Sequence, residues 1–386
     1  MRPELDLLLC CSRTKVYPEQ TRRLSQLLQQ NLDWQDVLSL AQWHGMSPLL
    51  YWQLNALNSP QVPSQIFRKL KESFKYNVQR NLFLISQLIK ITKLCQDNGI
   101  AIVPFKGPIL ATTVYKNVTL RKFYDLDLLI APQDFYKVKS LLIAQGYHSR
   151  YQLDFQQESR RLRTNYECEF VHKKLDISID LHWQFAPPYF NFFLQPDNVF
   201  SQTDTLVLAG TKLPILKPNN LLLVLCINGT KDGWSSLQRI CDIAEFLQAY
   251  PTLDWSQLWQ QAKQYHCSRM VVLGLVLAHY YYQVSLPASA WDRLKQDPAI
   301  ASLAQQIRDR IAGENHSYLN RVQLAYFGLQ LQSNWQRRIN YTFKIIFAIN
   351  ERDLAFAALP KGLFIFYYPL RLWRLFLKYG LQQKVP

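Results

Sequence analysis

The sequence predicts an α+β protein in which a small unit of strands and helices lies between two helical regions. Two observations support this prediction. Apolar residues recur at helical spacing before residue 98 and again after residue 217. Between these limits, short β-branched or alternating runs take turns with helical segments, as in a unit built around a sheet. We therefore expect an N-terminal helical region at 1–98, an α/β core at 99–217 and a C-terminal helical region at 218–386.

The outer regions contain clear helical signals. Apolar residues recur every three or four positions from Gln65 to Asp97, as a core-facing helix requires. LDWQDVLSLAQWHG, from Leu32, and LDWSQLWQQAKQYHC, from Leu253, each place an aspartate where it caps a helix. This likeness has two explanations, two similarly capped helices or a duplication.

In the core, three strands are expected. They are the run GIAIVPFKG at 99–107, LDLLI at 126–130 and the alternating LDISIDLHW at 175–183. A helix should follow the second strand, since Pro132 and Asp134 open a helical pattern that stops near Gly146.

The C-terminal region should hold two helices after Pro218, with a polar break at 228–235. The apolar segment from Met270 contains a histidine and several tyrosines and reads as a buried helix. The last segment, LFIFYYPLRLWRLFLKYG, places Arg371, Arg374 and Lys378 at helical spacing. Such a helix either makes a peripheral contact with an anionic membrane or covers a neighbouring domain.

Charge and cysteine content narrow the expected partners and cellular compartment of the protein. Lys and Arg number 44 against 28 Asp and Glu, a formal net charge of +16, which favours nucleotides, nucleic acid or an acidic membrane surface as partners. Seven scattered cysteines with no CxxC spacing argue against a zinc site or a disulfide framework. The N-terminal apolar run is too short for a signal peptide, and no run is long enough for a transmembrane helix. We expect a cytoplasmic protein.

The stretch RKFYDLDLLI places two acids at the head of an apolar run. Side chains alternate faces in a strand, so Asp125 and Asp127 project to the same side while Leu126 and Leu128 point to the core. Two carboxylates on one face repel unless a cation lies between them, and hard oxygen ligands are those that Mg²⁺ prefers. An edge strand with a solvated polar face would also explain the pattern.

A further strand can add acids to this pair. In LDISIDLHW, Asp176, Ser178 and Asp180 share one face, so one or both aspartates can join the pair across the sheet. His182 has the same parity and is expected near the site, although a hydrogen-bonded histidine at a strand end is equally ordinary. Three carboxylates can hold two metal ions or leave one free as a general base.

A glycine corner and two basic residues complete the set of candidate site residues. In FKGP, Gly107 permits close backbone approach, and Pro108 suits the first turn of a helix whose N-terminus favours an anion. Lys106 and Arg121 lie near the acids in sequence and can neutralise phosphate charge. Together these residues indicate metal-dependent chemistry at a phosphate.

The stretch KGPILATTVYKNVTLRKFYDLDLLI resembles the core motif of the uncharacterised nucleotidyltransferase-like family, within the DNA-polymerase-beta-like superfamily. Segments from about residue 30 to 380 share the likeness, among them DLHWQF and LDWSQLWQQAKQYHC. The resemblance implies a small mixed-sheet nucleotidyltransferase core.

Position by position, the resemblance implies that Asp125 and Asp127 bind the catalytic Mg²⁺, with Asp180 as the third carboxylate. Lys106, Gly107 and Arg121 would line the triphosphate side, and Lys231, within INGTKDGW, would reach the nucleotide. Two features depart from the family pattern. Pro108 stands where many relatives have a serine, which Thr112 does not obviously replace, and Asn228 and Asp232 stand where histidines are expected.

The resulting expectation is an enzyme that moves a nucleoside monophosphate from an NTP to an acceptor hydroxyl or phosphate and releases pyrophosphate. One or two Mg²⁺ ions would assist, and the acceptor, a small molecule, a protein or RNA, stays open. The first alternative is a catalytically inactive nucleotide-binding or scaffold protein with the same fold. The second is a toxin-like enzyme acting on tRNA, against which stands the lack of an RNA-binding motif.

Overall fold

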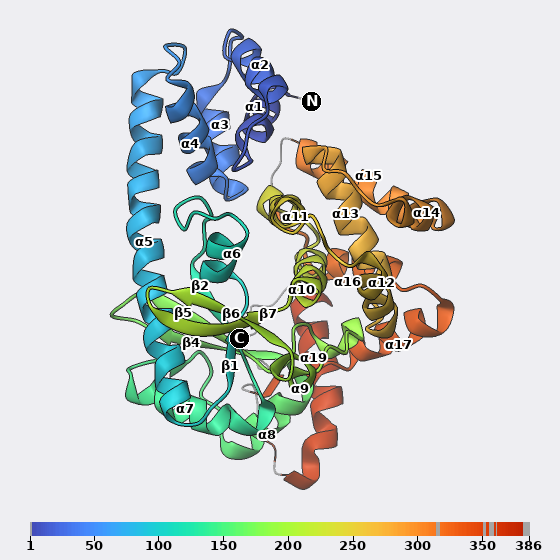
Figure 1. Cartoon of the computed structure of the whole chain (residues 1–386). Coiled ribbons are helices and arrows are strands. Elements are labelled where there is room, and N and C mark those ends of the chain that lie inside the picture. Colours follow the sequence, from blue (N-terminus) through green and yellow to red (C-terminus); the bar gives the residue numbers. More distant parts are fainter. Residues whose placement is uncertain (1, 314–316, 350–352, 355–358, 360, 381–386) are drawn as a thin grey trace.

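The computed structural model describes residues 2–313, 317–349, 353–354, 359 and 361–380. It confirms the expected α+β class. A five-stranded mixed sheet occupies the middle of the chain, and helices precede and follow it (Figure 1).

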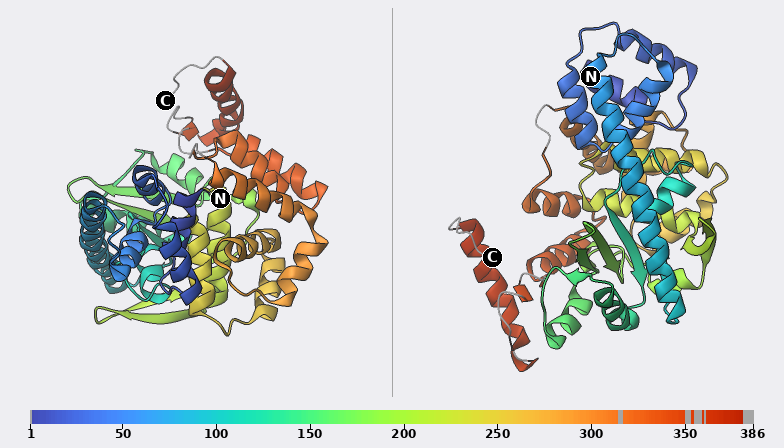
Figure 2. Two further views of the ribbon diagram at one scale, coloured as in Figure 1. Left: turned by 90° about the horizontal axis from the view of Figure 1, so that it is seen from above. Right: turned by 90° about the vertical axis from the view of Figure 1, so that its left-hand side faces the viewer.

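Five helices form the N-terminal part. They are α1 (Pro3–Cys11), α2 (Pro18–Leu27), α3 (Trp34–Trp43), α4 (Ser47–Leu57) and α5 (Ser64–Asp97). Asp33 caps α3 by accepting from the backbone N–H groups of Gln35 and Asp36, as its sequence predicts. α5, the helix expected from the apolar repeat, runs from the other N-terminal helices down along the sheet (Figure 2).

The main sheet has the strand order β1-β2-β5-β4-β3. Its strands are β1 (Ile102–Pro104), β2 (Asp125–Ile130), β3 (His148–Ser149), β4 (Glu167–His172) and β5 (Ile177–His182). β2 and β5 are parallel, whereas the other three neighbouring pairs are antiparallel. The three expected strands are therefore present: β1 and β5 are shorter than their sequence runs, β2 begins one residue earlier than its run, and β3 and β4 are additional.

Short helices connect the strands. They are α6 (Gly107–Thr113), a 3₁₀ turn η1 (Pro132–Asp134) leading into α7 (Phe135–Ala144), and α8 (Phe155–Thr164). After β5 come η2 (Pro188–Phe190) and α9 (Pro196–Phe200). A two-stranded hairpin, β6 (Thr203–Leu208) and β7 (Thr211–Leu216), then packs its second strand beside β1.

The C-terminal part is helical, as expected. Its elements are α10 (Pro218–Lys231), α11 (Leu237–Ala249), α12 (Trp255–Gln264), α13 (Ser268–Tyr282), α14 (Ala288–Gln296), α15 (Pro298–Ala312), α16 (Arg321–Gln330), α17 (Trp335–Ile346), η3 (Lys361–Phe366) and α19 (Tyr367–Gly380). Asp254 caps α12, and α13 is a mostly buried helix that includes the apolar segment from Met270. Within the described ranges, no helix is long and apolar enough to cross a membrane.

The two faces of the sheet belong to different apolar cores. Leu126, Leu128, Ile130 and their neighbours on β5 pack against α5 and α7. On the opposite face, Val103 of β1 and Leu129 of β2 join a larger core that combines the N-terminal helices with α10 to α15. Asp125 and Asp127 have the parity of Leu129, so they face the helical side of the sheet.

One expectation is wrong in detail. The polar break predicted at 228–235 begins only at Asp232, because α10 continues through Lys231. In the last helix, the guanidinium groups of Arg371 and Arg374 are buried and contact Asp353, so these two residues pack inward. The exposed side chains of α19 include the apolar Leu372, Trp373 and Phe376.

α5 also holds the loop that leads into β2. The side-chain amide of Asn81, which is fully buried, donates to the backbone oxygens of Val118 at 2.6 Å and Arg121 at 2.9 Å. One turn earlier, Asn77 donates to the backbone oxygen of Thr119 at 2.9 Å. These bonds satisfy loop carbonyls that a buried connection would otherwise leave unpaired.

Asn81→Ala should therefore lower the free energy of unfolding by about 2–4 kcal/mol, because two loop carbonyls lose their donor. Asn77→Ala, the matched control with one such bond, should cost about 1–2 kcal/mol. Urea unfolding of the two variants checks the difference, and equal losses would contradict the anchoring role of Asn81.

Candidate functional site

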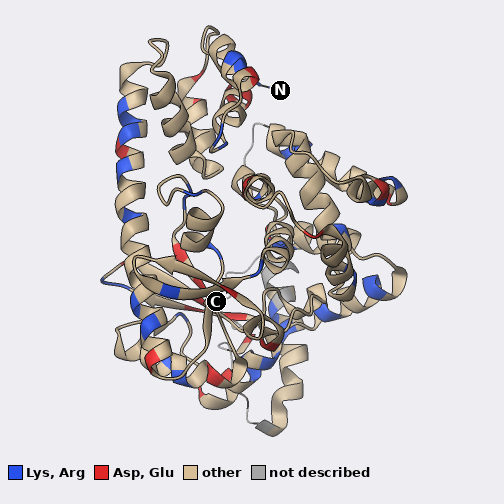
Figure 3. Ribbon diagram, viewed as in Figure 1, with Lys and Arg blue, Asp and Glu red and all other residues tan. Residues whose placement is uncertain are grey.

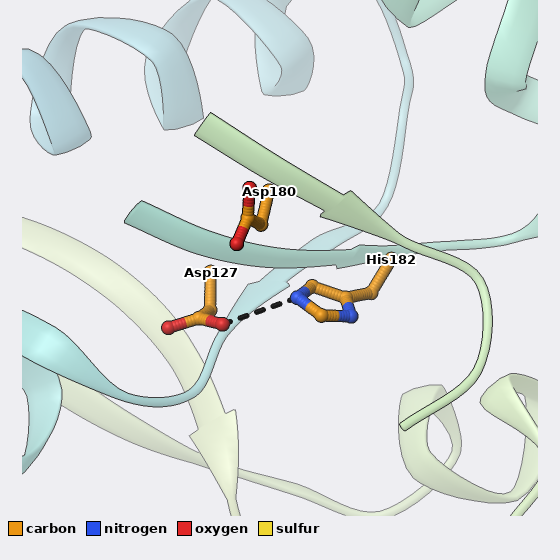
Figure 4. A group of neighbouring side chains, drawn as sticks. All are labelled: Asp127, Asp180 and His182. Carbon is orange, nitrogen blue, oxygen red and sulfur yellow. Dashed lines mark hydrogen bonds and ion pairs between the residues drawn. The ribbon is translucent and has the colours of Figure 1, made fainter. Parts of the chain in front are cut away.

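Two carboxylates lie side by side on the helical face of the sheet. Asp127 of β2 is the direct neighbour of Asp180 of β5, and Leu129 is the neighbour of His182. Because side chains at paired positions of parallel strands project to the same face, Asp127, Asp180 and His182 converge (Figure 4). Their nearest ligand atoms all lie within 4.8 Å of one another.

Asp127 is the most heavily contacted of these residues. Its Oδ1 lies 2.5 Å from Lys106 Nζ and 3.1 Å from His182 Nε2. Burial alone would raise the pKa of Asp127, but Lys106 and the hydrogen bond with His182 outweigh it and hold that pKa well below its usual range. Asp127 is therefore ionised and already attracts one cationic group.

Asp180 has no such cationic neighbour in direct contact within the part of the chain that the structure describes. Among the described residues it forms no hydrogen bond or ion pair, whereas Glu169, its neighbour on β4, pairs with Arg150 at 2.8 Å. Burial, followed by repulsion from Asp127, raises the pKa of Asp180 to about 8. The pair of carboxylates is thus short of positive charge, which a bound cation would supply.

His182 links Asp127 to a third acid. The ring is 1% exposed, and Nδ1 lies 3.3 Å from Glu167 Oε2 on β4. Burial would raise the pKa of Glu167, but the charges of Lys231 and His182 outweigh it and lower that pKa. Phe105 packs its ring edge-to-face on the imidazole, 5.0 Å between centroids, and helps to hold its orientation.

The glycine corner places Lys106 over the acids. Gly107 begins α6 with φ +39°, and a Cβ there would lie 3.3 Å from the backbone oxygen of Asp125. Both the left-handed conformation and this close approach favour glycine. The chain turns here so that Lys106 points back to Asp127.

A cavity of about 590 Å³, which we call the first cavity, opens beside this corner. Lys106, Gly107, Arg121, Asp125 and Asp127 all line it, so five of the residues expected at the site share one space. The remaining wall comes from the adjacent Lys122, Phe123 and Tyr124 and from residues far away in the sequence, namely Ser39, Gln42, Trp43, Gly45, Asp232, Ser235, Ser236, Gln238, Arg239 and Tyr318.

Arg121 also holds the wall of the first cavity together. Its guanidinium donates two parallel hydrogen bonds of 2.8 Å to Asp242 of α11, and both side chains are almost fully buried. The hydroxyl of Tyr115 donates to Asp242 Oδ1 as well, at 2.8 Å. Asp242 therefore ties the loop before β2 to the C-terminal helices.

Charge is unevenly distributed around the site. The acids gather on the central strands, while Lys and Arg recur along the outer helices such as α5 (Figure 3). Within the first cavity, Lys106, Arg121, Lys122 and Arg239 surround the acidic strand end. An anion carrying its own divalent cation suits this arrangement.

Two expected residues lie elsewhere. Asp176 is not at the site: β5 begins at Ile177, and Asp176 occupies a left-handed turn with its side chain 94% exposed. Lys231 does not line the first cavity but a second one, beside Glu167. The Thr112 hydroxyl donates to the backbone oxygen of Pro108, so it offers no replacement for a phosphate-binding serine.

Sequence reasoning assigned no role to Glu167, Arg239 or Asp242. The alternation of ECEFVH, residues 167–172, was the available signal for β4 and hence for Glu167. Arg239 and Asp242 belong to an ordinary amphipathic helix, and only their contacts across the fold distinguish them.

Part of the chain is similar to a known protein family. The family described as "Uncharacterised nucleotidyltransferase" matches residues 30–283. A solved structure of the antibiotic-resistance factor ANT(2'')-Ia covers 53% of this chain and 100% of its own, at 13% identity and a TM-score of 0.35, a likeness too weak to carry an argument. No curated protein matches.

Asp242→Ala should lower the free energy of unfolding by about 3–5 kcal/mol, because it leaves the buried Arg121 unpaired. Asp232→Ala is the matched control. The ion pair between Arg239 and Asp232 is partly exposed, with side chains 31% and 38% exposed respectively. Loss of this pair should therefore cost at most about 1 kcal/mol. Comparable losses in chemical denaturation would contradict the structural role of Asp242.

Asp180→Asn should stabilise the metal-free protein, and increasingly so between about pH 4 and pH 8. In this window the folded wild type keeps a proton on Asp180 that the unfolded chain has lost, so wild-type stability falls as the pH rises. The asparagine cannot ionise and escapes this loss, which should reach on the order of 1 kcal/mol or more.

Unfolding in the presence of a chelator at pH 5, 7 and 8.5 measures this effect. A stability difference between the two proteins that does not change with pH would contradict the repulsion between Asp127 and Asp180.

Proposed function

Because the chain belongs to the uncharacterised nucleotidyltransferase family, we propose that it transfers a nucleoside monophosphate from an NTP to an acceptor hydroxyl or phosphate. The observation that carries this proposal is the charge-deficient pair of Asp127 and Asp180, of which Asp127 lines a cavity with basic walls. A metal-bound triphosphate supplies both the missing positive charge and the anion that those walls suit.

The donor set fits a divalent cation. Asp127 and Asp180 offer adjacent oxygens, Asp180 has no competing partner among the described residues, and Asp125 lines the same cavity two residues before Asp127. These are the hard ligands that Mg²⁺ prefers, so we propose that the three aspartates hold one or two Mg²⁺ ions. When bound, Mg²⁺ would neutralise phosphate charge and polarise the reacting phosphate.

We assign His182 a positioning role rather than a ligand role. Its Nε2 already contacts Asp127 Oδ1, and its ring is held between Glu167 and Phe105. An imidazole fixed in this way orients the carboxylate beside it.

The basic residues of the first cavity would bind the triphosphate. Lys106 reaches Asp127 in the described state and would turn to the phosphates when the substrate enters, while Arg239 and Lys122 flank the same space. Gly107 leaves room for close approach of the phosphates to the backbone. Trp43 and Tyr318, whose ring centroids are 4.6 Å apart, offer aromatic surfaces for a base.

The transfer forms one bond and breaks another. The acceptor oxygen bonds to the α-phosphorus of the NTP, while the bond from that phosphorus to the oxygen bridging the β-phosphate breaks. Pyrophosphate leaves with the bridging oxygen. Where the acceptor is a hydroxyl, its proton passes to Asp180 when that carboxylate is free, or to solvent when Asp180 holds the metal.

The state of the cysteines bears on the cellular compartment of the protein. The seven cysteines are free and buried, which is compatible with a reducing compartment, and we propose a cytoplasmic location.

Asp127→Asn should reduce Mg²⁺-dependent pyrophosphate release by at least about a hundredfold, because it removes a charge that holds the cation. Asp176→Asn is the matched control. This aspartate begins the DISID stretch that ends at Asp180 but is exposed outside the site, so the variant should keep wild-type turnover. Turnover unaffected by Asp127→Asn would refute the assignment.

The inactive alternative is separated by comparing binding with turnover. Calorimetry with NTP and Mg²⁺ should detect binding in either case, whereas only the enzyme releases pyrophosphate when cell extract supplies an acceptor. Binding that depends on Asp127 without any release under these conditions would favour the nucleotide-binding scaffold.

A further inference from the structure

A second cavity lies beside Glu167, the acid that His182 contacts. Its volume is about 890 Å³, and Tyr166, Glu167 and Lys231 line its inner end. Its outer wall comes from η2, α16, α17 and the start of α19. Most of that wall lies beyond residues 30–283, the part of the chain that matches the family.

A short bridge of side chains joins the two cavities. Asp127 lines the first cavity and contacts His182 at 3.1 Å, and His182 lies 3.3 Å from Glu167, which lines the second. The carboxylates therefore stand between two separate spaces. In an in-line displacement the acceptor oxygen approaches the phosphorus from the side opposite to the leaving oxygen, so an acceptor held in the second cavity would extend its reacting oxygen past Glu167 to the NTP.

The second cavity is rich in aromatic side chains. Among them are Tyr189, Phe190, Tyr341, Phe343, Phe347 and Tyr368. Tyr341 makes edge-to-face contacts with Tyr189 and Phe190, at 5.8 and 6.1 Å between centroids. Surfaces of this kind bind apolar or planar groups.

An exposed apolar stripe extends this wall along α17. It consists of Trp335, Ile339, Phe343, Ile346 and Phe347, which recur at helical spacing and are all exposed. Phe343 and Phe347 belong both to the stripe and to the cavity. An apolar chain can therefore continue from the cavity onto the surface without leaving apolar contact.

The cavity also carries an excess of positive charge. Among the described residues, Arg163, Lys231, Arg321, Lys344 and Arg371 line it, against the single acid Glu167. Arg371 is neutralised by Asp353, whereas Arg163 and Arg321 form no ion pair or hydrogen bond with any residue the structure describes. Lys344 donates to the side-chain oxygen of Asn191 at 2.6 Å, a neutral partner. Unpaired guanidinium groups beside an apolar wall suit an anionic group attached to an apolar body.

We propose that the second cavity binds the acceptor, and that the acceptor is an amphiphile with an anionic group and an apolar chain. This inference rests on the proposed function, because it places the acceptor opposite the NTP. The anionic group lies at Arg163, Arg321 and Lys344, and the apolar chain lies along Tyr341, Phe343 and the stripe of α17.

Octyl phosphate is a suitable probe, titrated calorimetrically into the full chain in the presence of a chelator so that no turnover occurs. It should bind at least about tenfold more tightly than inorganic phosphate, which lacks the chain, and than octyl glucoside, which lacks the charge. Equal affinity for either comparison compound would overturn the corresponding half of the proposal. Tighter binding of a hexauridylate RNA would assign the cavity to nucleic acid and overturn it entirely.

Two variants locate the binding. Arg321→Gln and Phe343→Ser should each weaken octyl phosphate binding by about tenfold, since both side chains are exposed and line the cavity. Arg338→Gln, on the same helix as Phe343, and Tyr326→Ser, on the same helix as Arg321, are matched exposed controls outside the cavity and should bind as wild type. Equal effects of the variants and the controls would contradict the location.

A separate titration with Mg²⁺ and a non-hydrolysable NTP analogue distinguishes the two proposals. The analogue should bind wild type, Arg321→Gln and Phe343→Ser equally, because it occupies the first cavity. Analogue binding without octyl phosphate binding overturns the acceptor inference alone. Octyl phosphate binding that depends on Arg321 and Phe343, without analogue binding, overturns the nucleotidyl-transfer proposal and leaves the second site standing as an amphiphile site.

Discussion

The repulsion between Asp127 and Asp180 is the constraint around which the site is arranged. The register of two parallel strands places these carboxylates side by side, and burial strengthens their interaction. Lys106 and His182 contact Asp127 directly, but Asp180 has no ion pair or hydrogen bond with any described residue. A site built in this way is stabilised by a cation, which is the property that metal-dependent phosphate chemistry requires.

The helical regions supply the rest of the wall of the first cavity and hold the loop before β2 in place. The N-terminal helices share one apolar core with α10 to α15, so Trp43 and Arg239 reach the same cavity from distant parts of the chain. The bidentate pair of Arg121 and Asp242 fastens the loop before β2 to α11, and Asn81 fastens the same loop to α5. The position of the aspartates is thus set by contacts outside the sheet as much as within it.

Local patterns in the sequence predicted the parts that depend on parity. Alternation along DLDLLI and ISIDLH placed Asp125, Asp127, Asp180 and His182 on one face, and the glycine corner placed Lys106 near them. The same parity argument included Asp176 wrongly, because it assumed that the strand began before Ile177.

Long-range contacts were beyond such reasoning. The partners Arg121 and Asp242 are 121 positions apart, and the turn-like composition of INGTKDGW concealed the helix that carries Lys231. The hairpin of β6 and β7 was missed although an Ala-Gly pair separates its two strands.

A crystal structure with Mn²⁺ and a non-hydrolysable NTP analogue would test the central claim most directly, because Mn²⁺ substitutes for Mg²⁺ and is visible by anomalous scattering. The account predicts an anomalous peak between Asp127 and Asp180, about 2.0–2.3 Å from their oxygens and from phosphate oxygens of the analogue. It also predicts that Lys106 leaves Asp127 for the phosphates. A metal and nucleotide bound elsewhere, with Lys106 still on Asp127, would contradict it.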